Sequence, residues 1–368
     1  MARPARARIN LAAFRHNLQL AIKWAGNAQV AAVIKADGYG HGIVAVARAA
    51  EQDGCMLAVA SIEEAARVRA AGIVAPILLL EGFFHASEPD ESGFDGLQWV
   101  IHSEHQLAAL EERDSGLDVV RPLSVWLKFN TGMNRLGLPV LQAESFVSRV
   151  CRLASVRLEG VMTHFACADE PENDFSGLQM ARFDSVLSTL DQVALPQGLK
   201  RSLCNSAGLQ QMPAARGDLV RPGIMLYGAS PFFARTAVQQ GLHAVMSLES
   251  ELIAVNELAE ADCVGYGLTW CASRVSRIGV VAMGYADGYP RHAPSGTPVW
   301  VSGKRVPLVG RVSMDMLTVD LTDHEVASVG DHVELWGANV SVDEVARSAG
   351  TIGYELLTGV SARVPRVY

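Results

Sequence analysis

Long apolar runs are missing from this sequence, although 49% of its 368 residues are hydrophobic. The most apolar stretch, residues 73–80, is interrupted by Pro76 and is far shorter than the ~20 residues that a membrane-spanning helix needs. The basic start MARPARARIN resembles the first segment of a signal peptide, but polar residues follow where an apolar run would be needed. We therefore expect no membrane partner, no export and a cytoplasmic location.

Runs of basic residues and paired cysteine motifs are missing as well. The formal net charge is -8, and a nucleic-acid surface needs concentrated positive charge, so we expect no nucleic-acid partner. The six cysteines lie far apart, with no C-x-x-C pair and no clustered His/Cys spacing typical of zinc. This pattern predicts a reducing compartment and no metal.

Short apolar runs alternate with helical patterns over the first 235 residues. Asn10 is placed to cap the first helix, and Ser61 with Glu64 forms a capping-box pattern before a later one. Eight parallel strands with helical crossovers close into a filled barrel. We predict a (β/α)8 TIM-like barrel, with an open doubly wound sheet as the alternative. The expected strands are residues 30–34, 57–60, 77–80, 97–101, 123–129, 158–163 and 203–205, with an eighth within 219–227.

The pattern changes beyond Pro231. Short runs rich in Val, Ile and Leu are separated there by Gly, Asp and Pro, which is typical of strands joined by turns. We expect two domains, a barrel at 1–235 and a mainly β domain at 236–368.

The stretch VAAVIKADGYGHG, residues 30–42, places a lysine at the end of the first barrel strand. Apolar residues fill the strand up to Ile34, and the glycines after Lys35 cannot continue it. A lysine amine at a barrel mouth can form a Schiff base with a carbonyl cofactor or substrate. The alternative is a solvated lysine that merely ends a strand.

Other polar side chains follow the later strands, and groups at the carboxyl ends of barrel strands meet at one mouth. Taken alone, Arg135 or His164 would be read as a structural ion pair or a buried histidine. Their common placement with the others indicates a site instead. The group comprises Lys35, Tyr39, Lys128, Arg135, His164, Asn205, Ser206, Arg221 and Gly223.

The loops at Ser206 and Gly223 follow the last two strands, where such barrels often bind phosphate through a hydroxyl and backbone N–H groups. A phosphorylated aldehyde held there and joined to Lys35 would be pyridoxal 5'-phosphate. If Arg221 faces the pyridine nitrogen, its permanent charge keeps that nitrogen unprotonated, which favours rapid reprotonation over transamination. A dinucleotide loop is the weaker alternative, since no full G-x-G-x-x-G pattern is present.

Several residues of the β domain also carry chemistry. VGYGLTW places Tyr266 between glycines, while MGYADGYPR and GRVSMDMLTVD contribute Tyr285, Met314 and Asp315. Tyrosines flanked by glycine are most often turn residues with a packed ring. A phenolate acts as a base where nearby cations lower its pKa from about 10.

Taken together, these motifs resemble those of bacterial alanine racemases. The resemblance rests on AVIKADGYGHG, KFNTGMNRLG, THFACAD, CNSAG, RPGIMLYG and VGYGLTW, which occur in the family's order, and extends to the terminal RVPRVY. It implies a barrel followed by a β domain, with pyridoxal phosphate bound to Lys35. It also implies a head-to-tail homodimer in which each active site takes residues from the partner's β domain.

The resemblance assigns the two bases to Lys35 and the partner's Tyr266, one on each face of the substrate. It places Arg221 at the pyridine nitrogen and Arg135 near the phenolic oxygen and the substrate. His164 would connect Arg221 with Tyr266.

Further residues receive supporting roles from the same resemblance. Lys128, usually carbamylated, would hold the arginine loop, and Met314 would bind substrate through its backbone amide. Tyr285 and Asp315 would line the entrance. The remaining contacts to the cofactor would come from Tyr39, Asn205, Ser206, Gly223, Ile224 and Tyr354. Asn130 departs from the family, which commonly has an acidic residue there, so the charge around Lys128 differs.

The sequence therefore predicts the interconversion of L-alanine and D-alanine, for peptidoglycan synthesis or for alanine catabolism. A racemase for another small amino acid and a non-catalytic carrier of the cofactor are the alternatives. A carrier would usually lack the β domain, and a related decarboxylase would have an acidic residue in place of Arg221.

Overall fold

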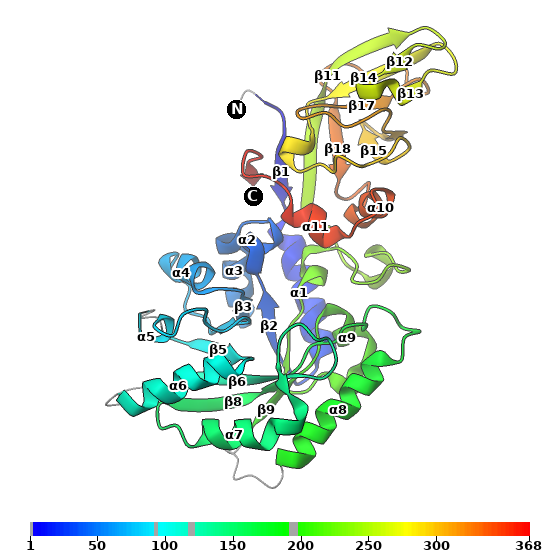
Figure 1. The fold of residues 1–368 in the computed structure, drawn as a ribbon. Coiled ribbons are helices and arrows are strands. Elements are labelled where there is room, and N and C mark those ends of the chain that lie inside the picture. The colour runs from blue at the N-terminus through cyan, green and yellow to red at the C-terminus, as the bar shows by residue number, and fades with distance from the viewer. Residues whose placement is uncertain (1–2, 92–94, 117–121, 191–197) are drawn as a thin grey trace.

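The computed structural model describes residues 3–91, 95–116, 122–190 and 198–368, and it contains a barrel and a second, mainly β domain (Figure 1). Every pair of neighbouring barrel strands is parallel, in the order β10-β2-β3-β4-β5-β6-β8-β9. Hydrogen bonds flank the remaining seam, from Asp218 N to Arg201 O at 2.8 Å and from Arg221 N to Cys204 O at 2.9 Å. The barrel strands are β2 (Gln29–Val33), β3 (Met56–Val59), β4 (Ile77–Leu79), β5 (Leu97–Ile101), β6 (Leu123–Asn130), β8 (Val156–Met162), β9 (Lys200–Ser202) and β10 (Leu219–Val220).

The predicted fold class is confirmed, but the seventh strand was placed wrongly. It covers Lys200–Ser202 rather than residues 203–205. Asn205 instead caps the short helix α9 (Ser206–Gln211) and accepts a hydrogen bond from Gly208 N at 2.9 Å. The strand was missed because two of its three residues are basic and their long side chains reach solvent, which hides the apolar signal.

Helices connect the strands as a barrel requires. The predicted cap at Asn10 is confirmed, since its side chain accepts from Ala13 N at 3.0 Å. Ser61 begins α4 without a side-chain capping bond. The helices are α1 (Leu11–Ala25), α2 (Lys35–Tyr39), α3 (Ile43–Gln52), α4 (Ile62–Ala70), α5 (Glu88–Glu91), α6 (Glu104–Gly116), α7 (Ala143–Cys151) and α8 (Phe175–Leu190), with β7 (Leu138–Pro139) and the turns η1 (Val140–Gln142), η2 (Pro213–Ala215), η3 (Ile224–Tyr227) and η4 (Val238–Gln240) between them.

The second domain extends away from the barrel along the long strand β11 (Met246–Leu258; Figure 1). Its sheet runs β16-β15-β18-β11-β1-β19, with β14 added to β11 and β17 added to β14. The other elements are β12 (Cys263–Val264), η5 (Tyr266–Leu268), β13 (Trp270–Cys271), β14 (Ser276–Val281), η6 (Tyr285–Asp287), β15 (Pro298–Val301), β16 (Lys304–Pro307), β17 (Leu317–Asp320), β18 (His332–Trp336), α10 (Val342–Ser348), α11 (Gly353–Thr358) and β19 (Arg366–Val367).

The N-terminal strand β1 (Arg6–Ile9) joins this second sheet. It pairs antiparallel with β11 and parallel with β19, so both ends of the described chain lie in the β domain. The domain boundary at residue 235 stays a prediction, although these first residues pack with the later part of the chain.

Two cysteines form a disulfide, between Cys263 and Cys271. The expectation that the cysteines lie far apart is wrong for this pair. The hairpin of β12 and β13 is antiparallel and brings residues eight positions apart into register. That spacing matches no pairing motif that a sequence alone reveals.

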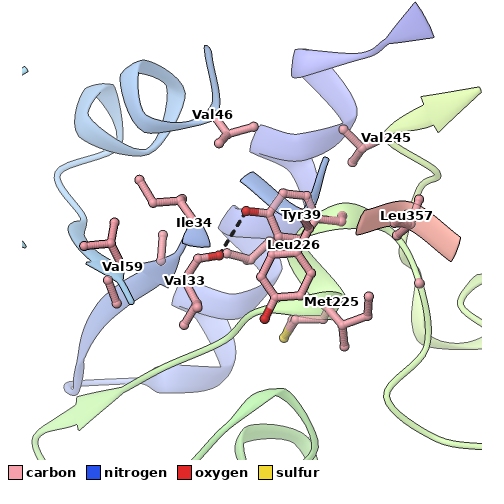
Figure 2. Close-up of a cluster of buried hydrophobic side chains, with 14 of the residues drawn as sticks. Val33, Ile34, Tyr39, Val46, Val59, Met225, Leu226, Val245 and Leu357 are labelled. Carbon is pink, nitrogen blue, oxygen red and sulfur yellow. Dashed lines mark hydrogen bonds between the residues drawn. The ribbon is translucent and has the colours of Figure 1, made fainter. Parts of the chain in front are cut away.

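Buried aromatic and aliphatic side chains fill the molecule, and one cluster supports the end of β2 (Figure 2). Tyr39 lies there among Val33, Ile34 and Leu357, the last contributed by α11. The hydroxyl of Tyr227 donates to Val33 O at 2.9 Å and holds the strand where it ends. Within the described ranges, no helix is both long and apolar enough to cross a membrane.

Candidate functional site

A cavity of about 530 Å³ lies at the carboxyl ends of the barrel strands. Side chains following six different strands line it, as the placement of polar residues after strands predicts. The lining contains Lys35, Tyr39, Glu81, Lys128, Arg135, His164, Asn205, Ser206, Arg221, Gly223, Ile224 and Tyr354, with apolar residues between them.

Lys35 begins a turn whose backbone is left-handed. Ala36, Asp37 and Tyr39 have φ values of 52°, 53° and 51°, a conformation that costs a non-glycine residue roughly 1–2 kcal/mol. Ala36 N donates to the Glu64 carboxylate at 2.7 Å, and this bond helps to hold the turn in place. Strain of this kind persists where surrounding contacts fix it, and here it sets the direction of Lys35.

Four cations define the charge of the cavity, namely Lys35, Lys128, Arg135 and Arg221, which we call the cation group. Among the described residues that line the cavity, Glu81 is the only carboxylate. Such an excess of positive charge favours an anionic ligand.

Lys128 is the most perturbed lysine of this group. Burial, followed by the charges of Arg221, Arg135 and Lys35, lowers the pKa of Lys128 from 10.5 to about 8. Its side chain therefore holds a substantial fraction of neutral amine in mildly alkaline solution.

Arg221 is buried and its guanidinium is held on several sides. It donates through Nη2 to Thr163 O at 2.7 Å and to Leu203 O at 3.3 Å, and through Nη1 to the Ser202 hydroxyl. The same Nη2 lies 3.3 Å from Nδ1 of His164. Burial lowers the pKa of Arg221 to about 10, so the group stays protonated at neutral pH.

His164 is the neutral partner of this arginine. Burial and then the charges of the cation group hold the pKa of His164 well below its usual range. A neutral ring accepts the Arg221 hydrogen bond at Nδ1, which leaves Nε2 to carry the proton.

Ser206 and Gly223 meet at the end of the cavity beside Tyr39. The Ser206 hydroxyl accepts from Gly223 N at 2.8 Å. A Cβ added to Gly223 would lie 2.4 Å from the Tyr39 hydroxyl oxygen, so only glycine allows this approach. The Tyr39 ring stacks on Tyr227 at 4.5 Å between centroids and lies 6.1 Å from the ring of Tyr354.

The loops that carry Arg135 and His164 are joined by buried polar groups. The Gln179 amide donates to Thr131 Oγ1 at 3.1 Å and to His164 O at 2.9 Å. The hydroxyls of Thr131 and Thr163 lie 2.7 Å apart. This chain of hydrogen bonds fixes the ends of β6 and β8 relative to each other.

The loop before Arg135 is shaped by Asn130. Its Oδ1 accepts from Gly132 N and from Asn134 N, both at 3.0 Å. These bonds account for the left-handed backbone of Asn134, with φ at 56°. The residue that departs from the family pattern thus has a structural use in forming the turn.

Of the β-domain residues that the sequence singled out, Tyr354 lines this cavity within one chain, but the other four do not reach it. The hairpin of β12 and β13, which carries Tyr266, lies at the far end of the β domain (Figure 1). Tyr266 is 70% exposed and Met314 is 53% exposed. Tyr285 and Asp315 are exposed as well, and none of the four is among the described residues that line the cavity.

Three functional residues escaped the sequence reasoning. Glu81 lies two residues after the end of β4, so the rule about strand ends could have found it. Glu64 was predicted only as part of a capping box, although its carboxylate also accepts a hydrogen bond from Ala36 N. Ser202 is a buried strand residue beside Arg221, and no signal in the sequence indicated that contact.

The residues present fit pyridoxal phosphate. A phosphate would find the Ser206 hydroxyl, which here accepts from Gly223 N, at the end of a cavity where cations predominate. Lys35 supplies the amine for the aldehyde, and Arg221 supplies a fixed cation. Among the described residues, no group of three or more His, Cys, Asp or Glu is arranged to hold a metal ion.

Comparison with known proteins covers the whole chain. Residues 9–231 match the family described as "Alanine racemase, N-terminal domain", and residues 245–368 match "Alanine racemase, C-terminal domain". The biosynthetic alanine racemase of Pseudomonas aeruginosa is 49% identical over 367 residues, which span 100% of this chain and 99% of that protein. The catabolic alanine racemase of Pseudomonas putida is 50% identical over 368 residues, with 100% and 99% covered.

The fold agrees with these matches. The crystal structure of biosynthetic alanine racemase from Pseudomonas aeruginosa superposes with a TM-score of 0.92 at 49% identity, covering 100% of this chain and 99% of that one. The structure of alanine racemase from Acinetobacter baumannii gives a TM-score of 0.88 at 36% identity, with 99% of each chain covered. On both sequence and structure, the chain belongs to the alanine racemase family.

Proposed function

We propose that this protein interconverts L-alanine and D-alanine with pyridoxal phosphate bound at Lys35. The observation that carries the proposal is the cavity itself, whose lining brings together a lysine at the start of a left-handed turn, the loops of Ser206 and Gly223 and a buried arginine. Full-length similarity to alanine racemases supports the same substrate. When bound, the cofactor withdraws electrons from the α-carbon of alanine and makes its proton removable.

Inversion at one carbon needs a proton removed on one face and returned on the other. We assign the first face to the Lys35 amine and the second to the phenol of the partner's Tyr266. Each group acts as base in one direction and as acid in the other, which makes the reaction reversible.

Arg221 would favour racemisation over transamination. Its guanidinium remains charged, because its pKa of about 10 lies above neutral pH. Arg221 would hold the cofactor at its pyridine nitrogen, where a fixed cation would disfavour protonation and so favour return of the proton to the α-carbon. Neutral His164, which accepts a hydrogen bond from Arg221, would connect this guanidinium with the partner's Tyr266.

Lys128 is placed to become a carbamate. Its lowered pKa supplies neutral amine, which adds to CO₂ with formation of an N–C bond and release of one proton to water. The product replaces a buried cation by an anion next to Arg135. We infer that this exchange removes repulsion within the cation group and holds Arg135 towards the substrate.

A second copy of the chain completes the site. Several apolar side chains of the β domain are exposed besides Tyr266, with Leu268 62% exposed, Met314 53% and Met316 44%. An apolar surface of this kind is a typical protein contact. A head-to-tail homodimer would cover it and would bring Tyr266 and Met314 to the partner's cavity.

We place this activity in the cytoplasm, in D-alanine supply for peptidoglycan or in alanine catabolism. The four unpaired cysteines among those described fit a reducing compartment, whereas the Cys263–Cys271 disulfide is of a kind that is rare there. The relatives include one biosynthetic and one catabolic enzyme at nearly equal identity, so similarity does not favour one of these two roles over the other.

The test is the conversion of L-alanine to D-alanine, followed in both directions with Tyr266→Phe and Lys35→Ala. We expect each variant to lose at least about 100-fold in kcat, in line with removal of a general base. Tyr289→Phe is the matched control, because its buried hydroxyl has no hydrogen-bond partner in the described part of the chain. Wild-type rates for Tyr266→Phe would refute the two-base assignment, and faster turnover of serine than of alanine would favour another small amino acid as substrate.

A further inference from the structure

The last residues of the chain connect two turns that belong to different parts of the proposed mechanism. Residues 361–368, which we call the C-terminal segment, contact the turn that starts at Lys35 and also the loops that carry Tyr285 and Met314. The pairing of β19 with β1 fixes this segment in the sheet of the β domain.

Arg366 holds the Lys35 turn. Its Nε donates to Gly40 O at 2.9 Å, the residue at which the left-handed backbone ends. The rest of its guanidinium donates to the carbonyls of Val360, Ser361 and Val364 at 2.7–2.8 Å. One planar fork therefore binds the turn of Lys35 to the C-terminal segment.

Tyr368 strengthens this contact. Its hydroxyl donates to His41 O at 3.1 Å. A Cβ on Gly42 would overlap that hydroxyl, which shows how closely the chain end packs on the turn. Two consecutive carbonyls after the left-handed backbone, those of Gly40 and His41, are thus fixed by the C-terminal segment.

Arg363, three residues before Arg366, binds the second of the two turns, the one that contains Asp287. Its Nε donates to the Asp287 carboxylate at 2.7 Å, and its Nη2 pairs with Asp315. The Asp287 side chain is fully buried and also accepts from Arg3 and from Gly284 N. Burial alone would raise the pKa of Asp287, but these donors outweigh it and hold the pKa below its usual range.

The Asp287 carboxylate in turn positions Met314. Tyr285 N donates to Ser313 O and Ala286 N donates to Met314 O, both at 3.0 Å. The backbone of Met314 is therefore held by the turn that Asp287 closes. Arg363 links that turn to the C-terminal segment through side chains, and Ser361 N adds a backbone bond to Asp287 O at 3.0 Å.

We propose that Arg366 and Arg363 are positioning residues for two different active sites. Arg366 sets the Lys35 turn in the cavity of its own chain. Arg363 sets the Met314 loop that this chain contributes to the partner's cavity. The inference rests on the proposed shared site, and a segment of only a few residues then connects the two sites of one dimer.

Hybrid dimers separate the two roles. A Lys35→Ala chain paired with a Tyr266→Phe chain has one complete cavity, with Lys35 from the second chain and Tyr266 from the first. We expect this hybrid to regain about half the wild-type activity, while each parent homodimer stays inactive. Differently tagged chains allow the hybrid to be purified for kinetics.

The arginine substitutions are then placed in one chain at a time. Arg363→Lys should lower activity about 10-fold or more, chiefly through KM, only in the Lys35→Ala chain, because that chain contributes Met314 to the complete cavity. Arg366→Lys should act only in the Tyr266→Phe chain, which contributes Lys35. Lysine keeps the charge but loses the planar fork, so the variants test geometry rather than charge.

Cofactor affinity provides a readout apart from activity. Titration of the cofactor-free homodimers by absorbance should show about 10-fold weaker binding for Arg366→Lys and unchanged binding for Arg363→Lys. The matched control is Arg305→Lys, since Arg305 also binds a carboxylate and a backbone carbonyl, those of Glu344 and Asn339, in the same domain. It should change neither quantity.

The outcomes distinguish the two proposals. Equal losses whichever chain carries the substitution would show that the arginines only stabilise the fold, and would overturn the inference while the shared site stands. A hybrid without recovered activity would refute the shared site and the inference with it. Thermal unfolding of every variant identifies losses that come from misfolding.

Discussion

Gly223 is the position at which the cavity tolerates no side chain, because it lies against the Tyr39 hydroxyl. We expect Gly223→Ala to weaken pyridoxal phosphate binding at least 10-fold, since its Cβ would lie 2.4 Å from that oxygen and force the ring to move. The measurement is an absorbance titration of the cofactor-free protein. Gly177→Ala is the control, because nothing lies within 4 Å of its added Cβ in α8. Equal affinity of the two variants would contradict the assignment.

Lys128 should make stability depend on pH in a defined direction. Its pKa is about 8 in the folded chain and 10.5 when unfolded, so the unfolded state binds more protons between these values. The cost of the buried charge is therefore full below pH 8 and is relieved as pH rises towards 10.5. Relative to Lys128→Met, the free energy of unfolding should rise over this range by at most about 3–4 kcal/mol, at 1.36 kcal/mol per pKa unit.

Denaturant unfolding at several pH values in CO₂-free buffer measures this difference. Added bicarbonate should flatten the wild-type slope, because a carbamate no longer carries the lysine charge. Parallel pH profiles for wild type and Lys128→Met would show that Lys128 is not the group responsible.

Individual site residues were predictable where they follow a strand. Lys35, Lys128 and His164 come directly after or at the end of apolar runs, and parallel strands bring such positions to one mouth. Asp37 in a left-handed backbone was not predictable, since the sequence shows a preference for that conformation only at the glycines around it. Contacts between distant segments, such as Ser202 with Arg221, leave no local pattern either.

At the scale of elements, strands and helices with local signals were found and non-local pairings were not. β1 gives no sign in its own residues that it adds to a sheet built from residues beyond 245, because register depends on the partner strand. The disulfide of the β12–β13 hairpin was likewise not predictable, because it depends on which residues the strand pairing brings into register. It encloses the η5 turn with Tyr266 and so constrains the element that carries the proposed second base.

We expect this disulfide to matter for turnover but not for cofactor binding. Closing so short a loop restricts the chain by an amount of the order of 2–3 kcal/mol, and the barrel is not involved. Replacing Cys263 and Cys271 by serine should lower kcat several-fold and leave the cofactor titration unchanged. Cys151→Ser, at an exposed free cysteine, is the control and should change neither.

Thiol counting shows the state of the pair. The unfolded oxidised chain should present four reactive thiols, and a dithiol reductant that donates two electrons and two protons should raise the number to six. Six thiols before reduction would mean that the hairpin is held by its hydrogen bonds alone.

At the scale of the whole molecule, the cation group lies in the barrel, and the β12–β13 hairpin, which carries the proposed second base Tyr266, lies at the far end of the β domain (Figure 1). The fold class was predictable from the sequence, because it rests on long motifs in a fixed order, and the division of roles between the two domains stays a prediction. The separation of the cation group from Tyr266 was not predictable, since it depends on how β11 projects the β domain away from the barrel.

Activity should therefore require association of two chains. Leu268 lies beside Tyr266 and is 62% exposed, so Leu268→Asp places a charge in the apolar surface that a partner would cover. We expect this variant to be monomeric by sedimentation and to lose at least about 10-fold in kcat. Its cofactor absorbance should remain, because Lys35, Ser206 and Gly223, which are proposed to hold the cofactor, all lie in the barrel of the same chain.

Val74→Asp is the matched control for this change. Val74 is 81% exposed on the barrel domain, so the substitution adds the same charge outside the β domain and should leave both mass and activity at wild-type values. Raising the protein concentration should restore activity to Leu268→Asp as dimers reform, since the tyrosine itself is intact. A fully active monomer would show instead that Tyr266 reaches Lys35 within one chain, which would require β11 to bend and return the hairpin to the barrel mouth.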